Sequence, residues 1–135
     1  MTLNKPILLV EDDVVDQMTV TRSLKELNVA NELYVANNGE EGLDVLKSNN
    51  EKPGLILLDL NMPKMNGIEF LQIIKTDDNF KMIPVVVLTT SKQEKDKVES
   101  FNLGIAGYMV KPVDYDQFLD IMKSIHHYWS TSETL

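Results

Sequence analysis

Acidic side chains follow two apolar runs of this sequence directly, and side chains of this type can bind a divalent cation. Glu11, Asp12 and Asp13 follow the run at 7–10, and Asp59 follows the run at 55–58. Unbroken aliphatic runs that stop at polar residues are typical of strands buried on both faces. Asp59 would then lie where a parallel strand leaves the sheet, the usual place of chemistry in open α/β folds. Taken alone, the position fits a helix-capping carboxylate equally well.

Side chains of two other kinds follow two later runs. Thr89 closes the β-branched run at 85–88, and Lys111 closes a short run at 108–110. Parallel strands end on one edge of a sheet, so these groups and the carboxylates would converge there. Two carboxylates ~4 Å apart repel by about 4 kcal/mol at an effective dielectric near 20, a penalty that a cation removes. Mg²⁺ suits the site, because it takes one or two carboxylates and is completed by water and phosphate oxygens. A carboxylate, a metal, an ammonium and a hydroxyl are the parts needed for phosphoryl transfer onto an aspartate.

The elements that would position these groups alternate along the whole chain. Five strands are expected at 7–10, 32–36, 55–58, 85–88 and 108–110, and five helices at about 14–27, 39–47, 67–75, 92–102 and 114–129. Such alternation predicts a parallel sheet covered on both faces. The flavodoxin-like strand order 2-1-3-4-5 is the common solution at this size. We expect a single domain over 1–135, with a core at about 5–129 and a frayed tail at 130–135.

Composition narrows the class of protein. The chain has 135 residues and a formal net charge of −8, which argues against non-specific binding to nucleic acid or to an anionic membrane. It has no cysteine, so disulfides and thiolate metal sites are excluded, as fits a cytoplasmic protein. No apolar run approaches the ~18 residues of a membrane helix. The residues at 1–6 lack the apolar core of a signal peptide.

The segments at the strand ends also resemble a known family. They are Glu11-Asp12, the stretch from Leu57 to Pro63 followed by Gly67, Leu88-Thr89-Thr90, and Tyr108-Met109-Val110-Lys111-Pro112. In this order, over about residues 5–129, the sequence resembles the receiver domain of two-component response regulators.

The resemblance implies a phosphoacceptor and a metal site. Asp59 would accept a phosphoryl group from a sensor histidine kinase. Mg²⁺ would be held by Glu11 through a water molecule, and by Asp12, Asp59 and the backbone carbonyl of Asn61. The protein would be a signalling phosphoacceptor rather than an enzyme, catalysing only its own phosphorylation and dephosphorylation.

The resemblance also implies how the phosphoryl group is sensed. Thr89 and Lys111 would bind its oxygens, and Tyr108 would be a switch that rotates inward as Thr89 moves. The Lys111–Pro112 bond would be cis. Of the remaining acidic residues, we expect Asp13 to cap the first helix and Asp16 to be solvated.

A finer resemblance concerns partners. The segments 30–33, 83–91 and 116–129 are similar to those of stand-alone regulators paired with bacterial phytochrome-like histidine kinases. With no output domain in the chain, the signal would leave by contact with a downstream protein, and a homodimer through the last two helices and the fifth strand fits the pattern. Two alternatives stay open: a phosphorelay intermediate that passes its phosphoryl group to a histidine phosphotransfer protein, and a phosphatase or other hydrolase on the same acidic site.

Overall fold

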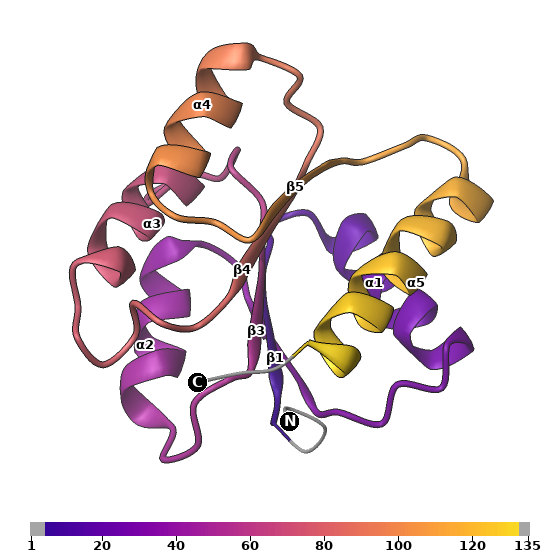
Figure 1. Ribbon diagram of the computed structural model, residues 1–135, viewed down its shortest axis with the longest axis horizontal. Helices are drawn as coiled ribbons and strands as arrows, with labels where there is room; N and C mark the ends of the chain where they lie inside the picture. The colour runs from indigo at the N-terminus through magenta and orange to yellow at the C-terminus, as the bar shows by residue number, and fades with distance from the viewer. Residues whose placement is uncertain (1–4, 133–135) are drawn as a thin grey trace.

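Strands and helices alternate through residues 5–132, the part of the chain that the computed structural model describes (Figure 1). The elements are β1 (Ile7–Val10), α1 (Val14–Glu26), β2 (Leu33–Ala36), α2 (Gly39–Ser48), β3 (Leu55–Leu58), α3 (Gly67–Lys75), β4 (Val85–Thr89), α4 (Glu94–Asn102), β5 (Gly107–Val110) and α5 (Tyr115–Thr131). Every expected element is present, with bounds that differ by only a few residues. Within the described range, no helix is long and apolar enough to cross a membrane.

The five strands form one parallel sheet in the order β2-β1-β3-β4-β5. The predicted flavodoxin-like order is therefore confirmed. Val10 pairs with Ala36 on one side and with Leu58 on the other, so β1, β2 and β3 end level with one another. This register brings the residues that follow β1 and β3 to neighbouring positions on the carboxyl edge.

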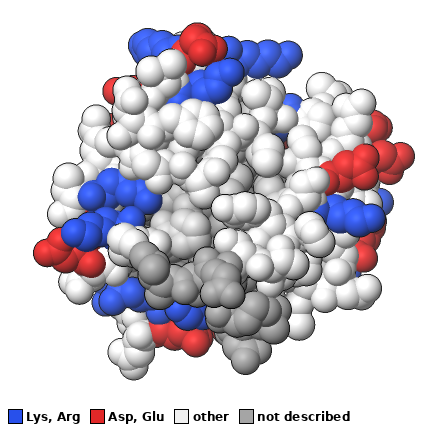
Figure 2. All heavy atoms as spheres, in the orientation of Figure 1, with Lys and Arg blue, Asp and Glu red and all other residues white. Residues whose placement is uncertain are grey.

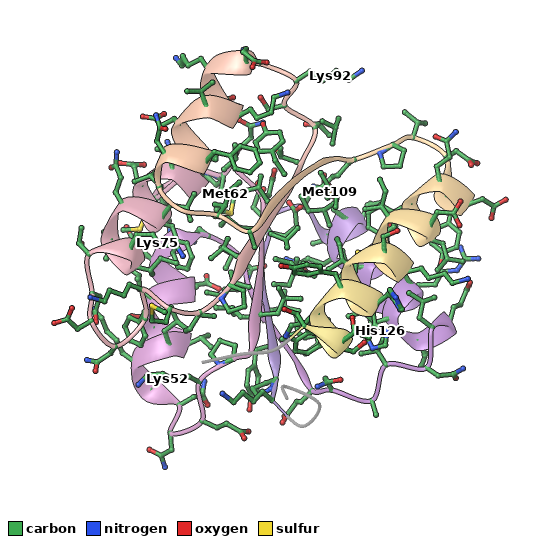
Figure 3. All side chains as sticks on the ribbon, in the orientation of Figure 1. Lys52, Met62, Lys75, Lys92, Met109 and His126 are labelled. Carbon is green, nitrogen blue, oxygen red and sulfur yellow. The ribbon has the colours of Figure 1, made fainter. Side chains whose placement is uncertain are left out.

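Helices cover both faces of the sheet, as Figure 1 shows: α2, α3 and α4 lie on one side, and α1 and α5 on the other. Alternate residues of each strand feed the two resulting cores, and in Figure 3 Met62 and Met109 lie on opposite sides of the sheet. β1, β3 and β4 are buried throughout, whereas the edge strand β5 is half-buried along its length. The central strands are thus rigidly packed beneath their carboxyl ends.

The two helices on the α1 side differ in how well their sequence indicates their buried face. In α5, Phe118, Met122, Ile125 and Trp129 recur at helical spacing and are buried, and the helix continues two residues past its expected end at 129. Residues 133–135 of the expected tail lie outside the described range. In α1, by contrast, the apolar residues Val15 and Met18 are 69% and 66% exposed. The buried residues of α1 are Val20, Ser23 and Leu24.

Candidate functional site

Backbone pairing brings Glu11 and Asp59 together at the carboxyl edge of the sheet. The amide of Asp59 donates to the carbonyl of Val10 (3.0 Å), and the amide of Glu11 donates to the carbonyl of Ala36 (2.9 Å). The carboxylates of Glu11 and Asp59 are both buried. That of Asp12, which follows Glu11 in the chain, is more accessible to solvent. One carboxylate oxygen from each of Glu11, Asp12 and Asp59 lies within 4.8 Å of the others. The carboxylates that the sequence singled out therefore form one cluster.

The helix that follows β1 is started by its own acidic residue. Asp13 Oδ1 accepts from the amides of Val15 (2.8 Å) and Asp16 (3.1 Å), so the predicted N-cap is confirmed. The amide of Asp13 in turn donates to Glu11 Oε2 (3.1 Å). The side chain of Asp13 is thus engaged by α1, and the cluster consists of the other three carboxylates.

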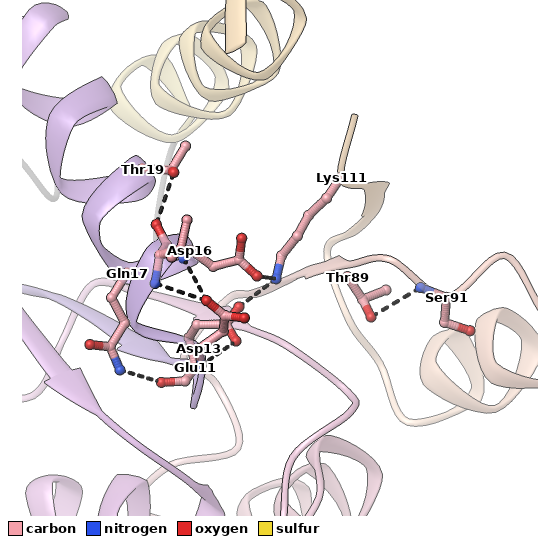
Figure 4. A network of polar contacts seen from close by, with 9 residues as sticks. Glu11, Asp13, Asp16, Gln17, Thr19, Thr89, Ser91 and Lys111 are labelled. Carbon is pink, nitrogen blue, oxygen red and sulfur yellow. Dashed lines mark hydrogen bonds and ion pairs between the residues drawn. The ribbon is translucent and has the colours of Figure 1, made fainter. Parts of the chain in front are cut away.

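Lys111 enters this cluster from β5. Its backbone amide donates to the carbonyl of Thr89 (2.7 Å), which fixes the strand end, and its side chain is only 7% exposed. The ammonium donates to Glu11 Oε1 (2.5 Å) and to Asp16 Oδ2 (2.9 Å), as Figure 4 shows. Asp16 was expected to be solvated, but it is an ion-pair partner of Lys111, because the first turn of α1 lies beside the strand end. No peptide bond in the described chain is cis, so the expectation of a cis Lys111–Pro112 bond was wrong.

Burial and charge shift the ionisation of two groups in the site. Burial, opposed by the hydrogen bond from Lys111 and reinforced by the charge of Asp59, raises the pKa of Glu11 from 4.5 to about 7. For Lys111, burial disfavours the ammonium, but the hydrogen bonds to Glu11 and Asp16 and the charge of Asp59 outweigh it and raise its pKa. The lysine is therefore a fixed positive charge at neutral pH.

Asp59 differs from Glu11 at one of its carboxylate oxygens, Oδ1, to which no described residue donates a hydrogen bond. Its side chain, including Oδ1, is buried. Buried carboxylate oxygens are normally paired, and an exception of this kind often marks a catalytic group or an ion site. Three convergent carboxylates, one with a free buried oxygen, fit the oxygen donor set of a hard divalent cation such as Mg²⁺.

A second polar network joins Thr89 to Tyr108 through Ser91. The amide of Ser91 donates to Thr89 Oγ1 (3.3 Å), and its hydroxyl donates to Asp96 Oδ2 in α4 (2.6 Å). The hydroxyl of Tyr108 donates to the carbonyl of Ser91 (3.0 Å). Thr89 is fully buried at the end of β4, the strand that lies next to β3 in the sheet. The sequence did not indicate that Ser91 would link these two residues.

The loop after β3 is held by α3. Asn66 Oδ1 accepts from the amide of Glu69 (2.9 Å), and the Glu69 side chain accepts from the amide of Asn66 (3.0 Å), which together form a capping box. The amide of Gly67 donates to the carbonyl of Leu60 (3.0 Å). Asn61 lies in this loop and is exposed; the role of its backbone carbonyl as a metal ligand stays a prediction.

Comparison with known proteins gives consistent matches over nearly the whole chain. The family model described as the response regulator receiver domain matches residues 7–123. Response regulator Rcp1 from Synechocystis is 38% identical over 136 residues, which cover 97% of this chain and 92% of Rcp1.

Two solved structures are similar in fold and in sequence. The phosphorylated cyanobacterial phytochrome response regulator RcpA matches with a TM-score of 0.91 and 38% identity, covering 98% of both chains. The Mn²⁺-bound form of Rcp1 matches with a TM-score of 0.87 and 37% identity, covering 97% of this chain and 98% of Rcp1.

Proposed function

The chain belongs to the receiver domains of two-component response regulators, and from this premise we propose that Asp59 is its phosphoacceptor and that Mg²⁺ is its metal. The observation that carries the proposal is the buried Oδ1 atom of Asp59, which has no hydrogen-bond partner among residues 5–132, on a carboxylate that clusters with those of Glu11 and Asp12. In this position a carboxylate oxygen is free to act as a nucleophile.

The transfer reaction assigns a task to each surrounding group. A carboxylate oxygen of Asp59 forms a bond to phosphorus while the bond between phosphorus and the donor histidine nitrogen breaks, and the electron pair stays on that nitrogen. Mg²⁺ bound by Glu11, Asp12 and Asp59 would neutralise the charge that builds up on the phosphoryl oxygens. Lys111 supplies a buried, permanently charged ammonium, and Thr89 a hydroxyl. Charge neutralisation and positioning of this kind supply most of the catalysis in phosphoryl transfer.

The donor is a sensor histidine kinase, as for receiver domains generally, and we infer that it is phytochrome-like. The similarity to RcpA, which is a phytochrome response regulator, supports this inference. A donor must approach the carboxyl edge of the sheet to reach Asp59, and α1 begins at that edge. Val14, Val15 and Met18 form an exposed apolar face on its first turns, with exposed fractions of 62–69%. We assign the kinase contact to this face.

Output would leave through the face formed by α4, β5 and α5. Val98 and Phe101 of α4 are each 49% exposed, and β5 is a half-buried edge strand. Figure 2 shows that charged side chains lie mainly around the rim of this view, leaving a central surface with few charges. A homodimer or a downstream protein would cover this surface in response to phosphorylation.

One experiment tests the central proposal. The protein is incubated with acetyl phosphate and Mg²⁺ and its intact mass is measured, beside Asp59→Asn and beside a sample with EDTA. The wild type should gain one acid-stable, base-labile phosphoryl group, and neither control should. A wild type that gains none, or an Asp59→Asn variant that gains the same group, contradicts the proposal.

Two further measurements test the proposed kinase contact and the proposed output surface separately. Met18→Lys should slow transfer from the kinase while leaving phosphorylation by acetyl phosphate unchanged, because the small donor needs no docking face. Sedimentation of the phosphorylated and unphosphorylated protein shows whether association depends on the phosphoryl group. The relay hypothesis drawn from the sequence stays a prediction.

A further inference from the structure

The ammonium of Lys111 is held away from the residue that it would serve. Its two hydrogen bonds go to Glu11 and to Asp16 (Figure 4). Asp59 Oδ1 receives none from the residues that the structure describes. Lys111 is nevertheless close enough for the charge of Asp59 to influence its pKa. The lysine is thus beside the proposed phosphoacceptor but engaged elsewhere.

Asp16 is the outer of the two partners. It lies in the first turn of α1, and its side chain is 36% exposed, against 2% for Glu11. Its backbone amide bonds to the N-cap residue Asp13, which fixes the turn on which it stands. The ion pair joins residues 95 positions apart and connects α1 to the end of β5. Asp16 therefore binds Lys111 from the first turn of α1, which is neither part of the carboxylate cluster nor one of the strand ends.

We propose that Asp16 is a positioning residue that retains Lys111 on the α1 side of the site until a phosphoryl group is bound. The inference rests on the proposed function, since it assumes that Lys111 serves a phosphoryl group on Asp59. Lys111 has three donor hydrogens, and the charge of an arriving phosphoryl group competes with the carboxylate of Asp16 for them. Each molecule in which Lys111 stays with Asp16 is less ready to neutralise the phosphoryl oxygens. Asp16 thereby slows phosphorylation.

Whether removal of Asp16 speeds or slows phosphorylation distinguishes a residue that retains Lys111 from one that aims it at the phosphoacceptor. If Asp16 only aimed Lys111 at the phosphoacceptor, its removal would weaken the site. If it retains Lys111, its removal should accelerate phosphorylation. A partly exposed ion pair of this kind corresponds to about a two- to five-fold change in rate.

The test measures phosphorylation by acetyl phosphate at saturating Mg²⁺, followed by intact mass. Asp16→Asn keeps the size of the side chain and removes its charge, and Asp16→Glu keeps the charge. Asp44→Asn is the matched control, because Asp44 is an exposed aspartate of α2, on the opposite face of the sheet from α1, and makes no hydrogen bond or ion pair with any described residue. Asp16→Asn should be about two- to five-fold faster than the wild type, with Asp16→Glu and Asp44→Asn close to the wild type.

A double-mutant cycle with Lys111→Ala shows whether the effect passes through the lysine. In the Lys111→Ala background, Asp16→Asn should cause no further acceleration. A second readout uses beryllofluoride, which mimics a phosphoryl group on an aspartate. The concentration that half-saturates the protein should fall with Asp16→Asn in the same proportion as the rate of phosphorylation rises. The inference is overturned if Asp16→Asn is no faster than the wild type, or if its acceleration persists without Lys111. In either case a wild type phosphorylated on Asp59 leaves the proposed function standing, whereas an unphosphorylated wild type overturns both.

Discussion

Gly67 packs so closely against Asp59 that a Cβ atom at position 67 would lie 2.5 Å from the Asp59 carbonyl oxygen. The same atom would lie 2.7 Å from the Cα atom of Leu60. The obstacles are backbone atoms, which cannot turn aside as a flexible side chain can. Any side chain at position 67 must therefore displace either the start of α3 or the backbone that carries the proposed phosphoacceptor.

Gly67→Ala is accordingly expected to lower the free energy of unfolding by about 1–3 kcal/mol, the usual cost of inserting a methyl group into a packed site. It should also slow phosphorylation, because the added methyl group clashes with the carbonyl of Asp59 itself. Denaturant unfolding measures the first effect and intact mass after acetyl phosphate the second. Gly107→Ala is the control: there the nearest atoms to the added Cβ lie 3.9 Å away, an ordinary contact. Equal losses from the two substitutions would contradict the argument.

Stabilisation by Mg²⁺ should increase with pH. The pKa of Glu11 is raised from 4.5 to about 7, so without metal its contribution to stability is full below pH 4.5 and is lost as pH rises through about 7. Stabilisation by the bound metal changes with pH in the opposite direction: it increases as pH rises, because the cation needs the ionised carboxylate and displaces the proton. The difference in Tm between samples with Mg²⁺ and with EDTA should therefore widen from about pH 5.5 to about pH 8.

Glu11→Gln provides the control for this pH dependence. The amide has no proton to lose, so whatever stabilisation by Mg²⁺ remains should vary little over the same range. A wild-type difference that is constant with pH would show that Glu11 does not titrate against the metal.

The residues of the site were predictable because they follow the strand ends. In a parallel sheet every strand ends on one edge, so Asp59, Thr89 and Lys111 could be brought together from strand order alone. The N-cap at Asp13 was equally predictable from the sequence, since an acidic residue before a helical pattern accepts hydrogen bonds from the amides that follow it. The convergence of the strand ends and the N-cap at Asp13 both depend on local sequence pattern and on which end of each strand or helix a residue occupies.

The partners within the site were not predictable in the same way. Asp16 meets Lys111 because α1 and the end of β5 lie beside each other, and nothing in the spacing of 95 residues signals it. The rotation of α1 is set by packing against the sheet and α5, which buries Val20 and leaves Met18 exposed. Pair contacts between distant elements thus require the three-dimensional structure.

Tyr108→Phe should loosen the loop after β4 without impairing phosphorylation by acetyl phosphate. The variant loses the hydrogen bond from the tyrosine hydroxyl to the Ser91 carbonyl, worth about 0.5–1.5 kcal/mol. Hydrogen exchange of the amides at 90–93 should become faster, while Asp59 and its surroundings are unchanged. Tyr128→Phe, which alters a side chain of a 64% exposed residue, is the control and should change neither measurement. Unaltered exchange in Tyr108→Phe would show that the Tyr108 hydroxyl does not hold this loop.

Trp129→Phe should lower the free energy of unfolding by about 1–3 kcal/mol, because it leaves a buried carbonyl without its donor. The indole nitrogen of Trp129 donates to the carbonyl of Gly54 (3.0 Å), immediately before β3, and the indole is buried. This bond ties the last turns of α5 to the start of the strand whose other end carries Asp59. Circular dichroism during denaturant unfolding measures the loss, since the variant removes the only tryptophan of the chain. His127→Ala, at an exposed position of the same helix, should cost far less. If the two substitutions cost the same, the loss reflects the helix alone, and the bond to Gly54 contributes nothing to the anchoring of α5.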